Sequence, residues 1–103
     1  MSLHVECGTA RLVGSSIMPV EIGGGLLWSE TLGSAGTTGL SAPAGPADGA
    51  AAVVFTITAE VNGWIAIGPA PDANVLAFRR RIRAGATRSF LAPNGVRVAW
   101  LPG

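Results

Sequence analysis

The stretch VVFTITAEVNGWIAIG, residues 53–68, decides the fold of this 103-residue chain. In its first half, Val53, Phe55 and Ile57 alternate with other residues, and this two-residue period is typical of a strand with one buried face. Asn62-Gly63 interrupts the run and favours the positive φ angles of a tight turn. The apolar run then resumes and stops at a Gly-Pro pair. The stretch predicts one β-hairpin, which the remaining chain has to cover.

Other short apolar segments, separated by turn-forming residues, lie on both sides of this hairpin. They predict further strands over residues 3–13, 17–22, 26–30, 87–91 and 96–101. An isolated glycine inside a strand often marks a bulge, and Gly8 is such a residue. In the last strand the alternation directs Val96, Val98 and Trp100 inward. The fold class is therefore all-β, a small antiparallel β-sandwich or barrel of jelly-roll type in one domain, residues 1–103.

Residues 31–52 interrupt this pattern of strands. The segment contains five glycines and two prolines and almost no bulky side chains, so it cannot offset the entropy of its own ordering. We expect an extended loop or arm that lies on a neighbouring molecule. A loop lying free on the surface is the alternative.

The segment VLAFRRRIR, residues 75–83, fits two different elements. As a strand it would direct Leu76, Phe78 and Ile82 to the core. The side chains of Arg79, Arg81 and Arg83 would then face solvent. As a helix it would begin after Asp72 and end at Gly85. The surrounding β-structure favours the strand. Arg80 would then lie on the core side, where it must meet a carboxylate or emerge at a subunit interface.

Composition excludes several classes of protein. The net charge of +1 gives no general attraction to nucleic acid or to an anionic membrane. The single cysteine, Cys7, cannot form an intramolecular disulfide, and no apolar run reaches the roughly 20 residues of a membrane helix. We expect a soluble protein made in a reducing compartment.

The residue types that carry catalysis do not combine into a recognisable set. Cys7 is expected to be a buried structural thiol, and His4, the only histidine, lacks the convergent ligands of a metal site. The carboxylates show no spacing that suggests an acid–base pair, and Gly23-Gly24-Gly25 lacks the Lys-Ser/Thr of a phosphate loop. We expect no enzymatic activity, no metal and no cofactor.

The second half of the chain resembles small structural proteins of tailed-bacteriophage particles, namely head-decoration, cement and head-fibre subunits. The resemblance lies in a strand that ends in a Gly-Pro turn, an Ala-Gly turn, an Arg-Ser-Phe strand and a closing Gly-x-x-Val-Ala strand. These are residues 66–73, 84–85, 88–90 and 95–100. The resemblance covers residues 50–101, about half of the chain, and its motifs consist mostly of turn residues and apolar alternation.

This resemblance implies a non-enzymatic virion protein that decorates or cements a capsid. It implies a homotrimer on the capsid surface, assembled in the cytoplasm of the bacterial host, whose partners are its own copies and the major capsid protein. Direct nucleic-acid or membrane contact is not expected. The residues expected at the interface are Arg79, Arg80, Arg81, Arg83, Trp28, Leu40, Pro43 and Pro46. For the four arginines, a solvated strand face is the alternative.

Trp28, Trp64 and Trp100 leave a second interpretation open. Exposed on one face, they would form a platform for sugar rings, as in a carbohydrate-binding or host-adhesion module of a phage fibre or spike. Packing in the core or at an interface is the interpretation that we favour, because a tryptophan buries a large apolar area.

Overall fold

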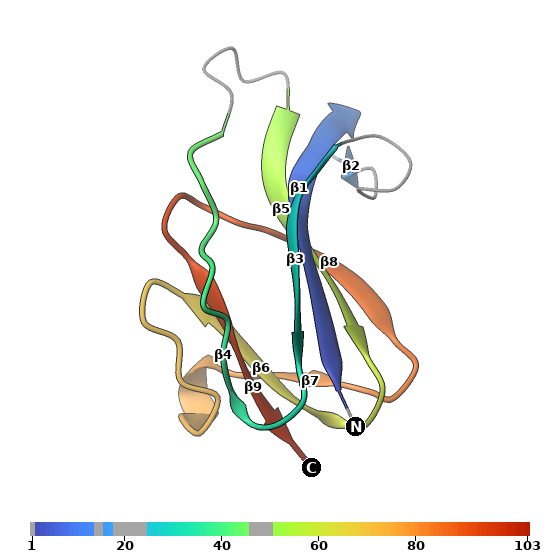
Figure 1. Cartoon of the computed structure of the whole chain (residues 1–103), viewed down its shortest axis with the longest axis vertical. Helices are drawn as coiled ribbons and strands as arrows, with labels where there is room; N and C mark the ends of the chain where they lie inside the picture. The colour runs from blue at the N-terminus through green and yellow to red at the C-terminus, as the bar shows by residue number, and fades with distance from the viewer. Residues whose placement is uncertain (1, 14–15, 18–24, 46–50) are drawn as a thin grey trace.

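Two antiparallel β-sheets face each other in the computed structural model, which describes residues 2–13, 16–17, 25–45 and 51–103 (Figure 1). The first sheet contains β1 (Leu3–Val13), β2 (Ser16–Ile17), β3 (Leu26–Leu32), β5 (Ala51–Ala59) and β8 (Thr87–Leu91). The second sheet contains β4 (Gly36–Thr37), β9 (Arg97–Pro102), β6 (Gly63–Gly68) and β7 (Arg80–Ile82) in that order. The predicted all-β class is confirmed, and the architecture is a sandwich.

β1 is the central strand of the first sheet. It pairs with β5 along one edge and with β2 and β3 along the other, and β8 extends the sheet beyond β5. The register between β1 and β3 shifts between Cys7 and Gly8, so the bulge predicted at this glycine is confirmed. Of the strand predicted over residues 17–22, only its first residue is described.

The predicted hairpin across residues 53–68 is wrong, although both of its strands form. β5 pairs with β1 and β8 in the first sheet, whereas β6 pairs with β7 and β9 in the second. The connection at Asn62 therefore crosses between the sheets, and neither Asn62 nor Gly63 has a positive φ. Asn62 anchors this crossing, since its Oδ1 accepts from Ala84 N and its carbonyl from Gly103 N.

The turn at residues 93–95 is also a crossing between sheets. It favours a hairpin in sequence, but β8 belongs to the first sheet and β9 to the second. Gly95 has a φ of 88°, which suits glycine. Turn-forming residues mark where the chain reverses. Which sheet the next strand joins is decided by the packing of the apolar faces of the two sheets against each other.

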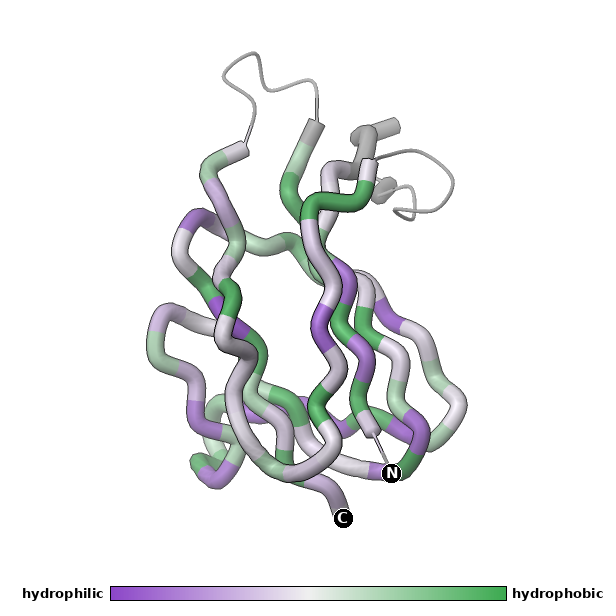
Figure 2. Tube along the Cα trace, in the orientation of Figure 1, coloured by the Kyte–Doolittle hydropathy of each residue, from purple (hydrophilic) through white to green (hydrophobic). Residues whose placement is uncertain are grey.

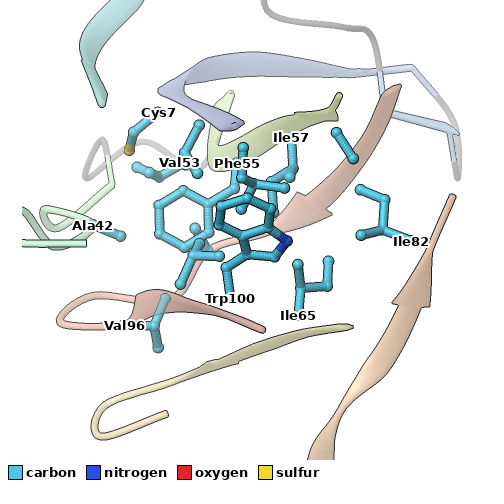
Figure 3. Packing of buried hydrophobic residues seen from close by; sticks show 14 residues of the cluster. Cys7, Ala42, Val53, Phe55, Ile57, Ile65, Ile82, Val96 and Trp100 are labelled. Carbon is cyan, nitrogen blue, oxygen red and sulfur yellow. The ribbon is translucent and has the colours of Figure 1, made fainter. Parts of the chain in front are cut away.

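The core lies between the sheets and is formed by the inward residues of the alternating pattern. Hydrophobic and hydrophilic positions alternate along the strands of the first sheet (Figure 2). Phe55 and Trp100 lie at the centre of the cluster (Figure 3), and Val96, Val98 and Trp100 are buried as predicted. The other large buried side chains include Leu3, Val5, Ile57, Ile65 and Ile82.

The segment expected as a loop or arm belongs in part to the sandwich. Residues 31–32 complete β3, residues 51–52 begin β5, and β4 pairs with β9. Beyond β4 the chain continues along β9, since Thr38 N donates to Val98 O and Ala42 N to Val96 O, both at 2.8 Å. As far as Ala42, the segment therefore runs beside residues 95–98 of its own chain. Residues 46–50 lie outside the described part.

Residues 75–83 form a shorter strand than predicted. Leu76–Phe78 is a single 3₁₀ turn, and β7 contains only Arg80–Ile82. Ile82 is buried as expected, but Leu76 and Phe78 are 75% and 78% exposed, so their predicted place in the core is wrong. The side chain of Asp72 accepts from Asn74 N at 2.9 Å, and Val75 N donates to Asp72 O. These turns occupy the residues that would have extended the strand.

Candidate protein-binding site

The two lateral sides of the sandwich, where the edges of the two sheets lie next to each other, differ in their contacts. On one side, β3 is fastened to residues 38–45 by side chains. Trp28 Nε1 donates to Ser41 O at 3.1 Å. The Glu30 carboxylate accepts from Gly39 N at 3.0 Å and from Leu40 N at 3.2 Å. This side is a bonded seam between the sheets.

The opposite side, between β7 and β8, contains a groove of about 940 Å³. We call it the β7–β8 groove. Its walls come from the end of β6, the 3₁₀ turn and β8, and its lining is largely apolar. The residues that line it include Ile67, Phe78, Arg80, Phe90, Leu91 and Val96.

Two arginines flank the half-buried ring of Phe90. The guanidinium carbons of Arg80 and Arg88 lie 5.2 and 5.1 Å from the ring centroid, within the range of cation–π attraction. Arg80 has the core-side phase that the sequence predicted, but it lies exposed over an aromatic ring, and no ion pair with a carboxylate is seen among the described residues. Arg88 Nη1 donates to Arg81 O at 3.1 Å, which joins the two edge strands at one end of the groove.

Arg79 and Arg81 contact the Trp64 ring on the outer face of the second sheet. Their guanidinium carbons lie 3.9 and 4.9 Å from the Trp64 ring centroid. Arg79 Nη1 also donates to Ala73 O at 3.5 Å, and Arg81 Nη1 to Gly103 O at 2.6 Å. The predicted arginine cluster is thus divided: Arg79 and Arg81 contact Trp64, Arg79 and Arg80 line the groove, and Arg83 is exposed and outside the groove lining.

Large apolar side chains are exposed around the groove. Phe78, Leu76 and Leu91 are 78%, 75% and 55% exposed, and Val75, next to Leu76 in sequence, is 41% exposed. Concentrated exposure of this kind marks binding surfaces more often than scattered single residues do. The site is therefore an apolar groove with no carboxylate among its lining residues, and the exposed Arg80 and Arg88 both lie at its Phe90 ring.

β8 also presents unpaired backbone groups at the groove. Ala92 N donates to Val53 O, and Ala59 N donates to Ala86 O, so the even-numbered residues of this stretch bond to β5. In an antiparallel pair the intervening residues direct their N–H and C=O groups to the opposite side. No described strand pairs with that side of β8. The residues with outward backbone groups are Thr87, Ser89 and Leu91.

The other residues expected at an interface lie elsewhere. Trp28 is half-buried in the bonded seam, where its ring lies 5.8 Å from that of Phe55. Leu40 and Pro43 are exposed on this same side, away from the groove. Pro46 lies outside the described residues.

Phe90 and Leu91, which line the groove, and Arg88, which lies over the Phe90 ring, are not among the site residues that the sequence predicts. Arg88 and Phe90 entered only through the resemblance, and the strand prediction for residues 87–91 was confirmed exactly. The available signal was the alternation of Arg88 and Phe90 on one face. It could not reveal that β7 would be too short to cover them.

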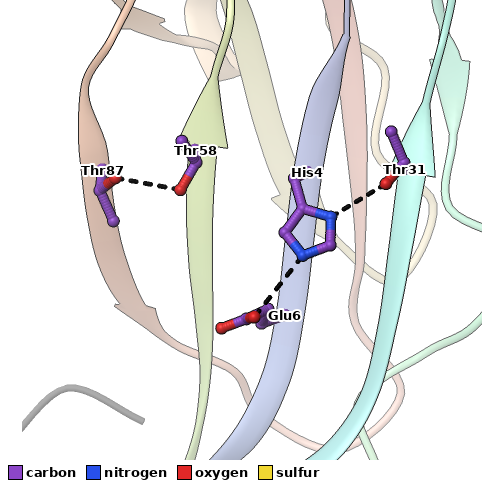
Figure 4. Close-up of polar contacts among 5 residues, drawn as sticks. All are labelled: His4, Glu6, Thr31, Thr58 and Thr87. Carbon is purple, nitrogen blue, oxygen red and sulfur yellow. Dashed lines mark hydrogen bonds and ion pairs between the residues drawn. The ribbon is translucent and has the colours of Figure 1, made fainter. Parts of the chain in front are cut away.

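The remaining reactive groups form no second site among the described residues. Burial raises the pKa of the Cys7 thiol to about 11. His4 Nδ1 lies 2.9 Å from Thr31 Oγ1, and its Nε2 lies 3.6 Å from Glu6 Oε1 (Figure 4). In the described ranges, no three His, Cys, Asp or Glu residues are grouped as metal ligands would be. These ranges also contain no helix that is long and apolar enough to cross a membrane.

Comparison with protein families, with characterised proteins and with solved structures finds no match for this chain.

Proposed function

We propose that this chain is a non-enzymatic structural subunit of a bacteriophage particle, which decorates or cements the capsid by bridging major capsid subunits. The observation that carries the proposal is the exposed β7–β8 groove with its apolar side chains and the exposed guanidinium groups of Arg80 and Arg88 at its Phe90 ring. The resemblance of residues 50–101 to virion proteins supplies the identity of the partner. The chain would act mechanically, by burying apolar area between neighbouring shell subunits.

Self-association is part of this proposal. Leu76 and Val75, which are not among the groove-lining residues, are 75% and 41% exposed and favour a contact with another copy of the chain. A partner that binds only the folded state stabilises it. We propose a homotrimer at the capsid surface. Light scattering after size-exclusion chromatography at micromolar concentration tests the oligomer, and a clean monomer would contradict this part.

A carbohydrate-binding module is supported less well by the placement of the tryptophans. Trp100 is buried, Trp28 is half-buried in the bonded seam, and the ring of Trp64 is contacted by Arg79 and Arg81. These positions share no exposed face. If the rings do bind sugars, glycan addition will quench or shift tryptophan fluorescence; unchanged spectra favour the structural role.

Capsids that lack this chain provide the direct test. We expect the purified protein to cosediment with them and to appear as added density by electron microscopy. Phe78→Ser should reduce the bound fraction about tenfold, because a large exposed side chain at an interface contributes on the order of 1–2 kcal/mol. Leu26→Ser is the matched control, since Leu26 is 57% exposed on β3 at the other side of the sandwich. No binding by the unaltered protein would refute the proposal.

A further inference from the structure

We propose that the β7–β8 groove binds an extended acidic segment of a partner protein, which pairs with β8 as an added strand of the first sheet. The inference deepens the proposed function and rests on it only in taking the natural partner to be a protein of the particle. The bound segment of that partner carries carboxylates that alternate with polar residues, around one central apolar side chain.

The free edge of β8 provides the backbone half of this recognition. Thr87, Ser89 and Leu91 direct their N–H and C=O groups away from β5, and an exposed strand edge is a template for another strand. β7 does not cover this edge, because it ends after three residues. Between the two edges lies a groove of about 940 Å³, which has room for an extended peptide.

The side chains that face the groove define what the added strand must carry. Arg88 and Phe90 are the inward residues of β8, and they alternate along one face. A strand paired with β8 would place a carboxylate beside Arg88 and Arg80, and an apolar side chain two residues away against Phe90 and Phe78. Its outward residues would lie next to Thr87 and Ser89, which favours polar ones.

Charge selects an acidic partner over a second copy of this chain. The groove lining contains Arg79 and Arg80 and no carboxylate, and Arg88 lies over the same ring as Arg80. Two copies joined through β8 would bring both sets of arginines to one edge, where like charges repel. An acidic segment from another protein instead neutralises them with charge-assisted hydrogen bonds.

The test uses the full chain and the fluorescein-labelled peptide Thr-Glu-Thr-Leu-Thr-Glu-Thr, which presents the required pattern in either chain direction. We expect saturable binding by fluorescence anisotropy, with an affinity that falls as salt screens the charges. Exchanging both glutamates for lysine should abolish binding. Arg80→Ala and Arg88→Ala should each weaken it about tenfold, whereas Arg83→Ala, which removes an exposed arginine outside the groove, should not.

Backbone pairing is tested separately from charge. Two versions of the peptide are N-methylated at alternate amides. In one version the methylated amides face β8, and in the other version they face away from it. We expect one version to lose binding and the other to keep it. Hydrogen exchange should slow at the Thr87, Ser89 and Leu91 amides of the protein when the unmodified peptide binds.

Several outcomes would overturn the inference. One is that the lysine peptide binds as tightly as the glutamate peptide. The others are that both N-methylated versions bind equally well, and that the peptide leaves hydrogen exchange at the β8 amides unchanged. Protection of the same amides by a concentration-dependent dimer without peptide would identify a second copy as the occupant. Capsid cosedimentation separates the two proposals. Capsid binding by a protein that does not bind the peptide contradicts this inference alone. Peptide binding by a protein that does not bind capsids contradicts the capsid role alone.

Discussion

The indole nitrogen of Trp100 lies directly over the backbone of Gly63. A Cβ atom at Gly63 would come within 2.6 Å of Trp100 Nε1 and 2.8 Å of Leu101 O. Trp100 is 1% exposed and its Nε1 is buried without a hydrogen-bond partner among the described residues. The absence of a side chain at Gly63 therefore allows the largest core residue to close over the start of β6.

Gly63→Ala should destabilise the protein by about 1–3 kcal/mol, since the added methyl group forces Trp100 or the backbone of β9 to move. Urea unfolding followed by fluorescence measures this difference. Gly68→Ala, at the other end of β6, is the matched control, because no atom lies within 4 Å of its added Cβ. Equal stability of the two variants would contradict the close contact.

Arg79 and Arg80 are neighbours in sequence with different expected roles. Arg79→Ala should lower the free energy of unfolding by about 1 kcal/mol, because it removes the guanidinium 3.9 Å from the Trp64 centroid. Arg80→Ala should change it by less than about 0.5 kcal/mol, since its side chain is exposed. Assembly should show the opposite order. If Arg80→Ala destabilises the fold as much as Arg79→Ala, the division of the cluster is wrong.

Most of the strands were predictable from the sequence because alternation records burial directly. Phe55, Ile57, Val98 and Trp100 all face the core as their period requires. The sheet to which each strand belongs was not predictable, because a turn such as Asn62-Gly63 reverses the chain equally well within one sheet or between two. Deciding between these depends on long-range pairing, which local sequence does not encode.

The candidate site was predictable only in part. The docking role of the arginine-rich stretch stays a prediction, whereas the alternation of the strand correctly separated Arg80 from Arg81. The groove itself depends on the 3₁₀ turn at Leu76–Phe78, which shortens β7 and leaves Phe90 uncovered. Several weak turn preferences around Asp72 produce that turn together, and each alone is compatible with a longer strand.

The seam between β3 and residues 38–45 should depend on Glu30. Glu30→Ala removes the acceptor of the Gly39 and Leu40 amides, and their hydrogen exchange should accelerate about tenfold. The Thr38 and Ala42 amides bond to the carbonyls of Val98 and Val96 instead and serve as internal controls. Equal acceleration at all four amides would indicate global destabilisation rather than a local fastening by Glu30.

The buried thiol of Cys7 should be unreactive in the folded protein and should limit stability at high pH. Its pKa is raised to about 11 from 9.0 by burial, so at pH 8 the thiolate fraction is about 100-fold lower than in the unfolded chain. We expect slow reaction with a disulfide reagent in buffer and rapid reaction in guanidinium chloride.

The sign of the pH dependence follows from the same shift. Because the unfolded thiol ionises first, stability should fall as the pH rises from about 9 to 11, since the unfolded state then binds fewer protons. Cys7→Ala should remove this part of the slope and leave the remaining pH dependence intact. Rapid labelling of the native protein at pH 8, at the rate of the unfolded chain, would show that the sheets open at β1 far more readily than a fully buried residue implies.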